Sequence, residues 1–329
     1  MKQIDERPAR EIFEWEGNPV NKLKVPPAPL YRDPIYDSPT DPVVIYNREE
    51  KCFWMLYTQR RATEINIGVS TVHGTKIGVA SSKDGLRWLY RGTLPNLEFE
   101  PGMNTFWAPE VIYANGKYHM YVSYVRGVPT DWKWDRNIIH YTADNMWDWH
   151  FESILPLSSN KVIDACVYEI SPGTYKMWYK DEANHSHTFS AISEDLYNWK
   201  VLGPEVTDVN HEGPNVFEFG GVKWLITDHW RGLGVYSSED FTHWTRKKDI
   251  LDKPGTRPGD NGFGHHADVV VCNDEAYIFY FTHPDRETTP PDQGLRACVQ
   301  VARLTTDGVN LYCNRDEEFE LNLTEPEGV

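Results

Sequence analysis

The sequence predicts an all-β fold, a five-bladed β-propeller with four antiparallel strands in each blade. Three observations carry this prediction. A short motif recurs five times, three apolar or alternating segments precede each copy, and hardly any helical pattern lies between them. Repeats of this kind stack around a common axis because one four-stranded blade cannot bury its own apolar faces. We therefore expect a single propeller domain in residues 41–329, with residues 1–40 as a Pro-rich arm packing on it.

The recurring motif links the third and fourth strands of each blade. Each copy supplies an Asp able to cap a turn, followed four or five residues later by an aromatic residue or Leu that begins the outer strand. The five copies begin at Ser82, Asp144, Ser193, Ser238 and Thr306, the last being degenerate.

Three segments upstream of each copy have the composition of strands, because they alternate or are uniformly apolar. In chain order they are 42–46, 53–58 and 77–80; 111–113, 118–124 and 138–142; 165–170, 175–179 and 188–192; 216–219, 223–227 and 234–236; and 269–272, 276–282 and 297–303. Residues 318–323 also alternate and could help to close the ring, although the sequence leaves open which terminus does so.

The loops divide between the two faces of the propeller. In an antiparallel blade the first-to-second and third-to-fourth turns share one face, and these turns are short. The other face carries long loops rich in polar and aromatic residues, at 59–75, 126–136, 181–186, 228–232, 247–265 and 283–295. We expect the functional site on that second face, since loops on a rigid scaffold commonly carry function.

Composition excludes several classes of partner. The formal net charge is -16, from 33 basic and 49 acidic residues, which argues against nucleic acid or an anionic membrane as a partner. No window approaches 18 apolar residues, so we expect a soluble protein, cytoplasmic or, if a signal peptide was removed, periplasmic or extracellular. The five cysteines stand at no metal-ligand spacing and are expected to be buried free thiols. The oligomeric state is left open.

An acidic residue stands at the expected start of every innermost strand, next to the propeller axis on the loop-rich face. Such positions are unfavourable for carboxylates, because a buried charge is costly unless it is paired or hydrogen-bonded. Cleavage of a glycosidic bond needs one ionised carboxylate to activate water and one protonated carboxyl to protonate the leaving oxygen. The five acids are Asp41, Glu110, Asp164, Glu212 and Asp268.

Five short segments resemble motifs of glycoside hydrolase family 43, the arabinanases, arabinofuranosidases and β-xylosidases, and of relatives such as the α-neoagarobiose hydrolases. The resemblance spans residues 41 to about 304. Its segments are Thr40-Asp41-Pro42-Val43-Val44, Phe106-Trp107-Ala108-Pro109-Glu110-Val111, Val162-Ile163-Asp164-Ala165, His211-Glu212-Gly213-Pro214 and Gly264-His265-His266-Ala267-Asp268. One departure is Ala165, where the family usually has Pro.

The resemblance implies a function and three catalytic roles. Asp41 would be the general base, Glu212 the general acid, and Asp164 the residue that modulates the pKa of the acid and orients it. The implied enzyme is an inverting glycoside hydrolase of oligo- or polysaccharides, and long loops on one face favour an exo mode. The sugar could be an arabinofuranoside, xyloside, galactofuranoside or anhydro-galactoside.

Further residues are candidates for contacts with a carbohydrate substrate. Aromatic rings could stack on a sugar face, and basic side chains could hold hydroxyl groups or a carboxylate. The candidates are Arg61, His73, Trp107, Glu110, Trp230, Arg231, His266 and Asp268. We expect no required cofactor. His266 could bind an axial cation such as Ca²⁺, but because Ca²⁺ prefers oxygen ligands, a hydrogen-bonding role is an equal alternative.

Other assignments stay open at this stage. Asp37 is an alternative base, and His211 could share proton transfer with Glu212. A propeller glycoside phosphorylase would need a phosphate site, for which Arg60, Arg61 and Arg231 are the visible material. A non-catalytic carbohydrate-binding propeller is the third alternative.

Overall fold

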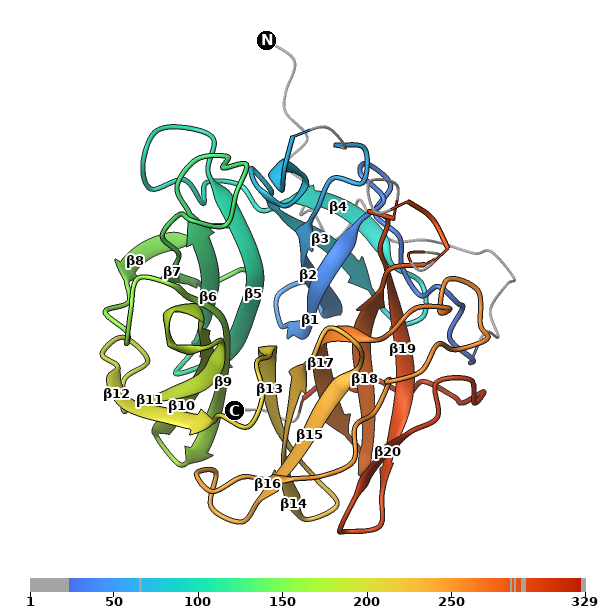
Figure 1. The fold of residues 1–329 in the computed structure, drawn as a ribbon. Helices are drawn as coiled ribbons and strands as arrows, with labels where there is room; N and C mark the ends of the chain where they lie inside the picture. Colours follow the sequence, from blue (N-terminus) through green and yellow to red (C-terminus); the bar gives the residue numbers. More distant parts are fainter. Residues whose placement is uncertain (1–23, 65–66, 285, 287, 291–293, 327–329) are drawn as a thin grey trace.

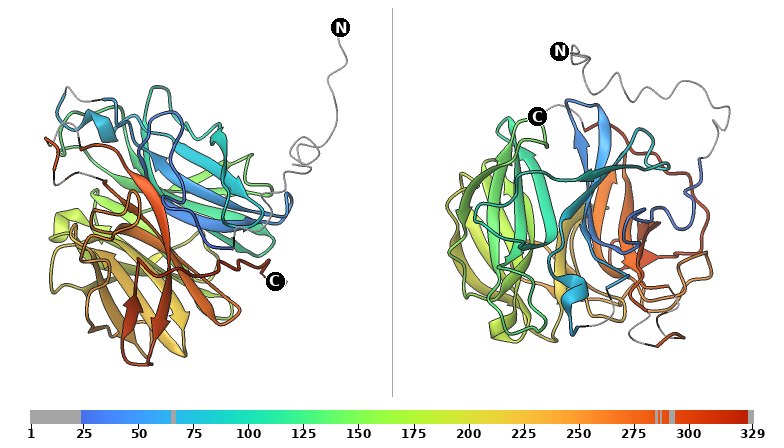
Figure 2. Two further views of the ribbon diagram at one scale, coloured as in Figure 1. Left: turned by 90° about the vertical axis from the view of Figure 1, so that its right-hand side faces the viewer. Right: turned by 90° about the horizontal axis from the view of Figure 1, so that it is seen from above.

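The computed structural model describes residues 24–326 except 65–66, 285, 287 and 291–293. Within these residues, twenty strands form five four-stranded antiparallel sheets, each built from consecutive strands. Figure 1 looks along the axis around which the sheets are arranged, and Figure 2 gives two perpendicular views. The predicted five-bladed β-propeller is confirmed.

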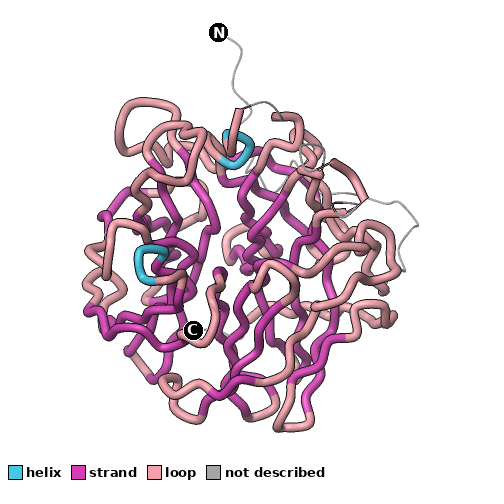
Figure 3. Tube along the Cα trace, in the orientation of Figure 1, coloured by secondary structure: helices cyan, strands magenta, loops and turns pink. Residues whose placement is uncertain are grey.

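Each blade begins with the strand nearest the axis and ends with the outermost strand. Blade 1 contains β1 (Pro39–Asn47), β2 (Cys52–Gln59), β3 (Ile77–Ser82) and β4 (Leu89–Thr93); blade 2 contains β5 (Thr105–Ala114), β6 (Lys117–Val125), β7 (Asn137–Ala143) and β8 (His150–Ile154); blade 3 contains β9 (Val162–Ser171), β10 (Thr174–Asp181), β11 (His187–Ser193) and β12 (Lys200–Val206); blade 4 contains β13 (Glu212–Phe219), β14 (Val222–Asp228), β15 (Leu233–Ser238) and β16 (Thr245–Arg246); blade 5 contains β17 (His265–Cys272), β18 (Glu275–Thr282), β19 (Cys298–Thr306) and β20 (Leu311–Cys313). The helical part of the described chain is two short 3-10 turns, η1 (Ser70–Val72) and η2 (Glu182–Asn184), drawn in cyan in Figure 3.

The core lies between neighbouring blades. Five clusters of buried apolar side chains fill the five inter-blade layers. Large rings from the second strands dominate these layers, and Trp54, Trp178 and Trp224 are fully buried. Because the five innermost strands also contact one another in a closed ring, their first residues are held around a common axis.

The recurring motif forms the turn between the third and fourth strands, as predicted. In blade 3, the Asp195 carboxylate accepts hydrogen bonds from the N–H groups of Tyr197 and Asn198. Leu196 follows with a positive φ of 68° and a fully buried side chain. One detail differs from the prediction: in blade 2 the capping residue is Asn145, not Asp144. An amide oxygen caps the turn as well as a carboxylate does.

Segments near both ends of the described chain close the seam between blades 1 and 5. Tyr31 pairs with Val299 of β19, and its hydroxyl lies 2.9 Å from that of Tyr57. The alternation predicted for residues 318–323 is present, with Phe319 and Leu321 buried in the same layer, but the segment forms no strand. The expected arm is described only from residue 24, so residues 1–23 of that prediction lie outside the described residues.

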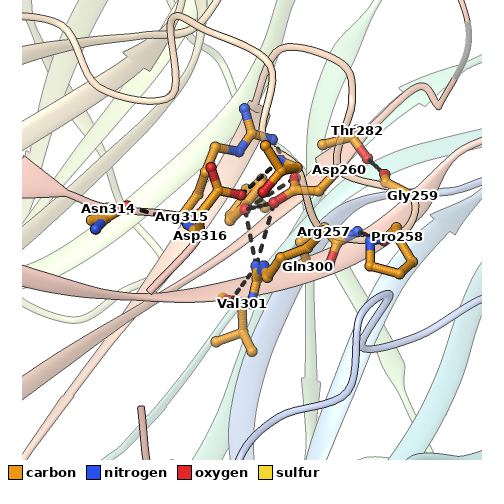
Figure 4. Close-up of polar contacts among 12 residues, drawn as sticks. Arg257, Pro258, Gly259, Asp260, Thr282, Gln300, Val301, Asn314, Arg315 and Asp316 are labelled. Carbon is orange, nitrogen blue, oxygen red and sulfur yellow. Dashed lines mark hydrogen bonds and ion pairs between the residues drawn. The ribbon is translucent and has the colours of Figure 1, made fainter. Parts of the chain in front are cut away.

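A buried polar cluster fixes the long loop between β16 and β17 (Figure 4). Asp260 is completely buried and accepts hydrogen bonds from Arg315, from Arg257 at 3.4 Å and from Tyr280 at 2.9 Å. Arg315 also donates to the carbonyl oxygens of Lys253 and Gly262. The segment after β20 therefore holds the loop that leads into β17.

Candidate active site

Three of the five predicted carboxylates gather at the entrance of the axis on the loop-rich face. Asp41 is the third residue of β1, Asp164 the third of β9, and Glu212 the first of β13. Every innermost strand has a register shift near its start. Such bulges redirect side chains. Asp41 and Asp164 also have positive φ angles of 51° and 59°, a backbone conformation that Asp tolerates better than most residues.

Asp41 lies within a shell of polar contacts. Its Oδ2 accepts a 3.0 Å hydrogen bond from the hydroxyl of Thr40 and lies 3.5 Å from Arg60 Nη2. Its Oδ1 lies 3.6 Å from His266 Nδ1. With a relative exposure of 5%, this carboxylate is largely removed from bulk water and is held by its neighbours.

Asp164 connects the entrances of three blades. Its backbone N–H donates to the hydroxyl of Ser123 in blade 2 at 2.9 Å, and its Oδ2 accepts from the N–H of Gly213 in blade 4 at 3.1 Å. Burial raises the pKa of Asp164 to about 7; His266 opposes this shift, whereas the negative charge of Glu212 adds to it.

Glu212 is paired with a buried lysine that the sequence did not reveal as a site residue. Its Oε2 lies 2.9 Å from Lys180 Nζ, which also contacts Glu182 at 3.0 Å. Burial alone would raise the pKa of Glu212, but the charge and hydrogen bond of Lys180 outweigh it and lower the pKa to about 2. The two pKa shifts have opposite signs, so Asp164 holds a proton more readily than Glu212 does.

His266 lies beside the three carboxylates. Burial disfavours its charged form, but Asp164, Asp41 and Glu212 outweigh burial and raise the pKa of His266. Among the described residues, no group of three or more His, Cys, Asp or Glu side chains could hold a metal ion. The axial cation expected at His266 thus stays a prediction, and the contact that the structure gives this ring is with Asp41.

Glu110 and Asp268 lie deeper along the axis than the other three acids. They line an axial cavity of about 320 Å³ together with Cys166 and Asn215. Glu110 accepts a hydrogen bond from the N–H of Val167 in the next blade. Asp268 accepts from Val44 in blade 1 and from Asn215 in blade 4. The structure therefore places these two acids where they join blades, not at the mouth.

Burial raises the pKa of both deeper acids. Burial, increased by the charge of Asp268, raises the pKa of Glu110 well above its usual value. Burial also raises the pKa of Asp268 to about 6.

An aromatic group stands on the blade 1 and blade 2 side of the mouth. The His73 ring lies 5.0 Å from that of Trp107 and 5.6 Å from that of Trp132, centroid to centroid. Trp132 is 54% exposed. Arg61 stabilises the segment that carries His73, because its guanidinium donates to the backbone carbonyl oxygens of Ser70 and His73.

The blade 4 loop places the two other candidates. Trp230 is 43% exposed, and its ring lies 5.5 Å from Lys180 Nζ. Arg231 stacks on the ring of Phe263 at 4.7 Å. Asp228, which had no predicted role, is buried and accepts hydrogen bonds from the N–H groups of Trp230 and His266. It therefore fixes the blade 4 loop against the start of β17.

The two alternative proton-transfer residues have other partners. His211 is fully buried between Thr188 and the carbonyl oxygen of Val209, and burial lowers its pKa to about 4. The described contacts of Asp37 are with Arg32 and Arg296.

Comparison with known proteins identifies the fold. No protein-family model matches the sequence, and no curated protein matches it. A thermostable family-43 glycoside hydrolase superposes with a TM-score of 0.62 at 20% identity, over 89% of this chain and 100% of that one. A family-43 β-xylosidase/α-arabinofuranosidase from a compost microbial metagenome gives 0.64 at 15%, over 86% and 96%. The chain has the propeller fold of these family-43 enzymes.

The likeness extends to a second family of propeller enzymes. A family-32 β-fructofuranosidase of Bombyx mori superposes with a TM-score of 0.65 at 14% identity, over 91% of this chain and 66% of that one.

In the part of the chain that the structure describes, no helix combines the length and apolar character needed to cross a membrane.

Proposed function

We propose that this protein is an inverting exo-glycoside hydrolase acting on an oligo- or polysaccharide, with an arabinofuranoside, xyloside, galactofuranoside or anhydro-galactoside as the sugar cleaved. The observation that carries the proposal is the convergence of Asp41, Asp164 and Glu212 at one mouth of the propeller axis. The solved structures with this fold include xylosidases and arabinofuranosidases, one of them in complex with xylotriose, which favours the same class of reaction.

Asp41 is the proposed general base. In an inverting reaction its carboxylate takes a proton from a water molecule as the water oxygen bonds to the anomeric carbon. Thr40 and Arg60 hold the carboxylate in place for this step. Inversion calls for a base and an acid separated by roughly 6.5–9.5 Å, so that the water fits between them.

Glu212 is the proposed general acid, which gives its proton to the departing glycosidic oxygen as the bond to the anomeric carbon breaks. Because Lys180 lowers the pKa of Glu212, this role requires the Lys180 contact to weaken when the substrate enters. Asp164, with its raised pKa, is the neighbouring group that carries a proton. The cycle closes when Asp41 loses its proton to solvent and Glu212 takes up a proton from solvent.

The test compares two substitutions on two kinds of substrate. Glu212→Ala should abolish turnover of a natural glycoside but largely spare an aryl glycoside with a strongly acidic leaving group, which needs no protonation. Asp41→Ala should abolish turnover of both. A panel of plant and algal oligosaccharides would identify the sugar, and NMR of the first-formed anomer would report inversion. Undiminished activity of Glu212→Ala on both substrates would remove it from the acid role.

The same assay separates the alternatives. A phosphorylase would form product only with added phosphate, and a binding propeller would retain glycans without cleaving any. For the phosphorylase, the candidate arginines are already engaged: Arg60 lies beside Asp41, Arg61 donates to backbone carbonyls, and Arg231 stacks on Phe263.

A further inference from the structure

A continuous chain of ion pairs leads from the proposed acid to the aromatic loop between β6 and β7. Glu212 contacts Lys180 at 2.9 Å, Lys180 contacts Glu182 at 3.0 Å, and Glu182 contacts Arg136 at 3.0 Å. Arg136 then donates to the carbonyl oxygens of Trp132 and Trp134 at 2.8 and 2.9 Å. The chain therefore joins the catalytic mouth to the loop that presents the exposed Trp132 ring.

The two cations of this chain are deeply buried. The side chains of Lys180 and Arg136 are each 4% exposed, whereas Glu182 is 21% exposed. A lysine is rarely buried to this extent unless it is paired, because removing an ammonium group from water is costly. Lys180 meets this requirement with two carboxylates, and the face of Trp230 covers it at 5.5 Å. Its ammonium group is thus fixed at one point beside Glu212.

Lys180 is the cation in direct contact with Glu212. Several charged groups surround this carboxyl from the elements packed around it. They are Arg60 after β2, Asp41 on β1, Asp164 on β9, His266 on β17, and Lys180 and Glu182 at the end of β10 and in η2. Among the described contacts of Glu212, the hydrogen-bonded ion pair is the one with Lys180, so the position and charge of this lysine act on Glu212 most directly.

We propose that Lys180 is a positioning residue for the reaction: it holds Glu212 at the mouth in its ionised form and, through Glu182 and Arg136, fixes the Trp132 loop relative to it. The inference rests on the proposed function in assigning the acid role to Glu212. The ion pair must loosen before Glu212 can carry a proton, so Lys180 sets the pH range in which the enzyme works.

Loss of the Lys180 charge should shift the pH dependence of activity in a definite direction. A general acid is active only while it is protonated, so activity falls as the pH rises through the pKa of that acid. Without the Lys180 charge, burial and the neighbouring carboxylates still raise the pKa of Glu212, and Arg60 and His266 still lower it; because Lys180 is the largest lowering influence, its loss moves the pKa upward. The alkaline limb of the kcat/KM profile should therefore move to higher pH, although the loss of positioning lowers kcat.

The experiment uses the full chain and two variants. Lys180→Met removes the charge and keeps the length of the side chain, whereas Lys180→Arg keeps the charge. Titration of the Glu212 carboxyl, followed by infrared or ¹³C NMR and assigned with Glu212→Gln, should shift upward by at least about one pH unit in K180M, a tenfold change in the protonation equilibrium. K180R should stay close to wild type. If K180M does not fold, Lys180→Gln should give the same upward shift.

The outcomes separate this inference from the proposed function. An unchanged Glu212 titration in a folded K180M or K180Q protein would overturn the inference, as would an equal shift in K180R. If the titration shifts in K180M but the wild-type protein hydrolyses no glycoside, the effect of Lys180 on Glu212 stands and the proposed function is refuted. A kcat/KM profile that drops uniformly without a shift of its alkaline limb would mean that Lys180 is merely structural.

Discussion

The backbone N–H of Gly213 at the entrance of blade 4 donates a 3.1 Å hydrogen bond to Oδ2 of Asp164 at the entrance of blade 3. Gly213 directly follows Glu212, so this bond fixes the backbone of the proposed acid with respect to its neighbouring carboxyl. The same bond joins the segments of two carboxyls whose pKa values shift in opposite directions: the pKa of Asp164 is raised, and that of Glu212 is lowered.

Asp164→Asn removes the titrating proton of Asp164 but keeps its hydrogen bond with Gly213, because an amide oxygen still accepts from the Gly213 N–H. We expect kcat/KM to fall by about 10²-fold or more, the usual scale for a proton-transfer group. We also expect greater stability at high pH. The raised pKa of Asp164 means that its stabilising contribution is complete below about pH 4 and is lost as the pH rises through about 7.

Thermal unfolding at several pH values checks this second expectation. The melting temperature of D164N should exceed that of the wild type at pH 8.5, and the gap should narrow as the pH falls toward 4. Parallel curves for the two proteins across this range would show that Asp164 is not buried in its neutral form.

Gly213→Ala tests the close approach of the blade 4 entrance to His266. Gly213 has a φ of 55°, and a Cβ built there would lie 2.7 Å from Cγ of the His266 ring. We expect a loss of about 1–3 kcal/mol in unfolding free energy from backbone strain and at least a tenfold loss of activity, since both Glu212 and His266 must move. Gly221→Ala is the matched control, because its φ is 75° and nothing lies within 4 Å of its Cβ position.

Urea unfolding and kcat/KM on the same substrate compare the two glycine variants. Both should lose the stability that a positive φ costs, but only Gly213→Ala should also lose activity. Equal activity in the two variants would show that the ring of His266 tolerates displacement.

The sequence predicted the fold and the three carboxylates at the mouth, but it placed the other two incorrectly along the axis. The repeated turn motif marks the end of each blade, so the blades could be counted. Asp41, Asp164 and Glu212 fall within the first three residues of their strands. Glu110 was expected at the start of a strand, but β5 begins at Thr105 because the polar and aromatic residues before Glu110 also pair with β6.

Lys180 could not have been found from local sequence alone. It follows an apolar segment in β10, which is an unusual place for a lysine, but the partner that explains it lies 32 residues later in another blade. Such a contact depends on how two blades pack, and the composition of either strand gives no sign of it. The same reason applies to Arg315, whose carboxylate partner Asp260 lies 55 residues earlier.

A buried histidine pair should make the protein sensitive to acid. His119 Nδ1 and His140 Nε2 lie 3.0 Å apart between blades 2 and 3. Burial lowers the pKa of His119 to about 4, and burial with the neighbouring His119 lowers that of His140 to about 3. The unfolded chain binds these protons near pH 6.5. Stability should therefore be complete above this pH and fall as the pH drops toward 4, by at most about 1.4 kcal/mol per pH unit for each histidine.

The urea concentration at the midpoint of unfolding, measured at pH 7, 6 and 5, gives the change of stability with pH. His140→Gln removes one titrating group and should reduce the loss of stability below pH 6.5, while other buried histidines such as His211 keep the rest of it. The exposed His150 provides the control, because His150→Gln should leave the slope unchanged. A slope in H140Q equal to that of the wild type would place the acid sensitivity elsewhere.

Arg315→Met should cause the largest loss of stability among these variants. It leaves the fully buried Asp260 without its main counter-charge, and breaking a buried pair from one side typically costs about 3–5 kcal/mol. The exposed pair of Arg126 with Glu100 is the matched control, since Arg126→Met should cost at most about 1 kcal/mol. The double variant Arg315→Met/Asp260→Leu should recover part of the loss, because it removes the uncompensated charge.

Hydrogen exchange across residues 253–264 should rise in R315M, where the carbonyl contacts of Arg315 are lost. Activity should fall with it, because this loop leads directly to His265 and His266; full activity in R315M would show that β17 keeps the two histidines in place unaided.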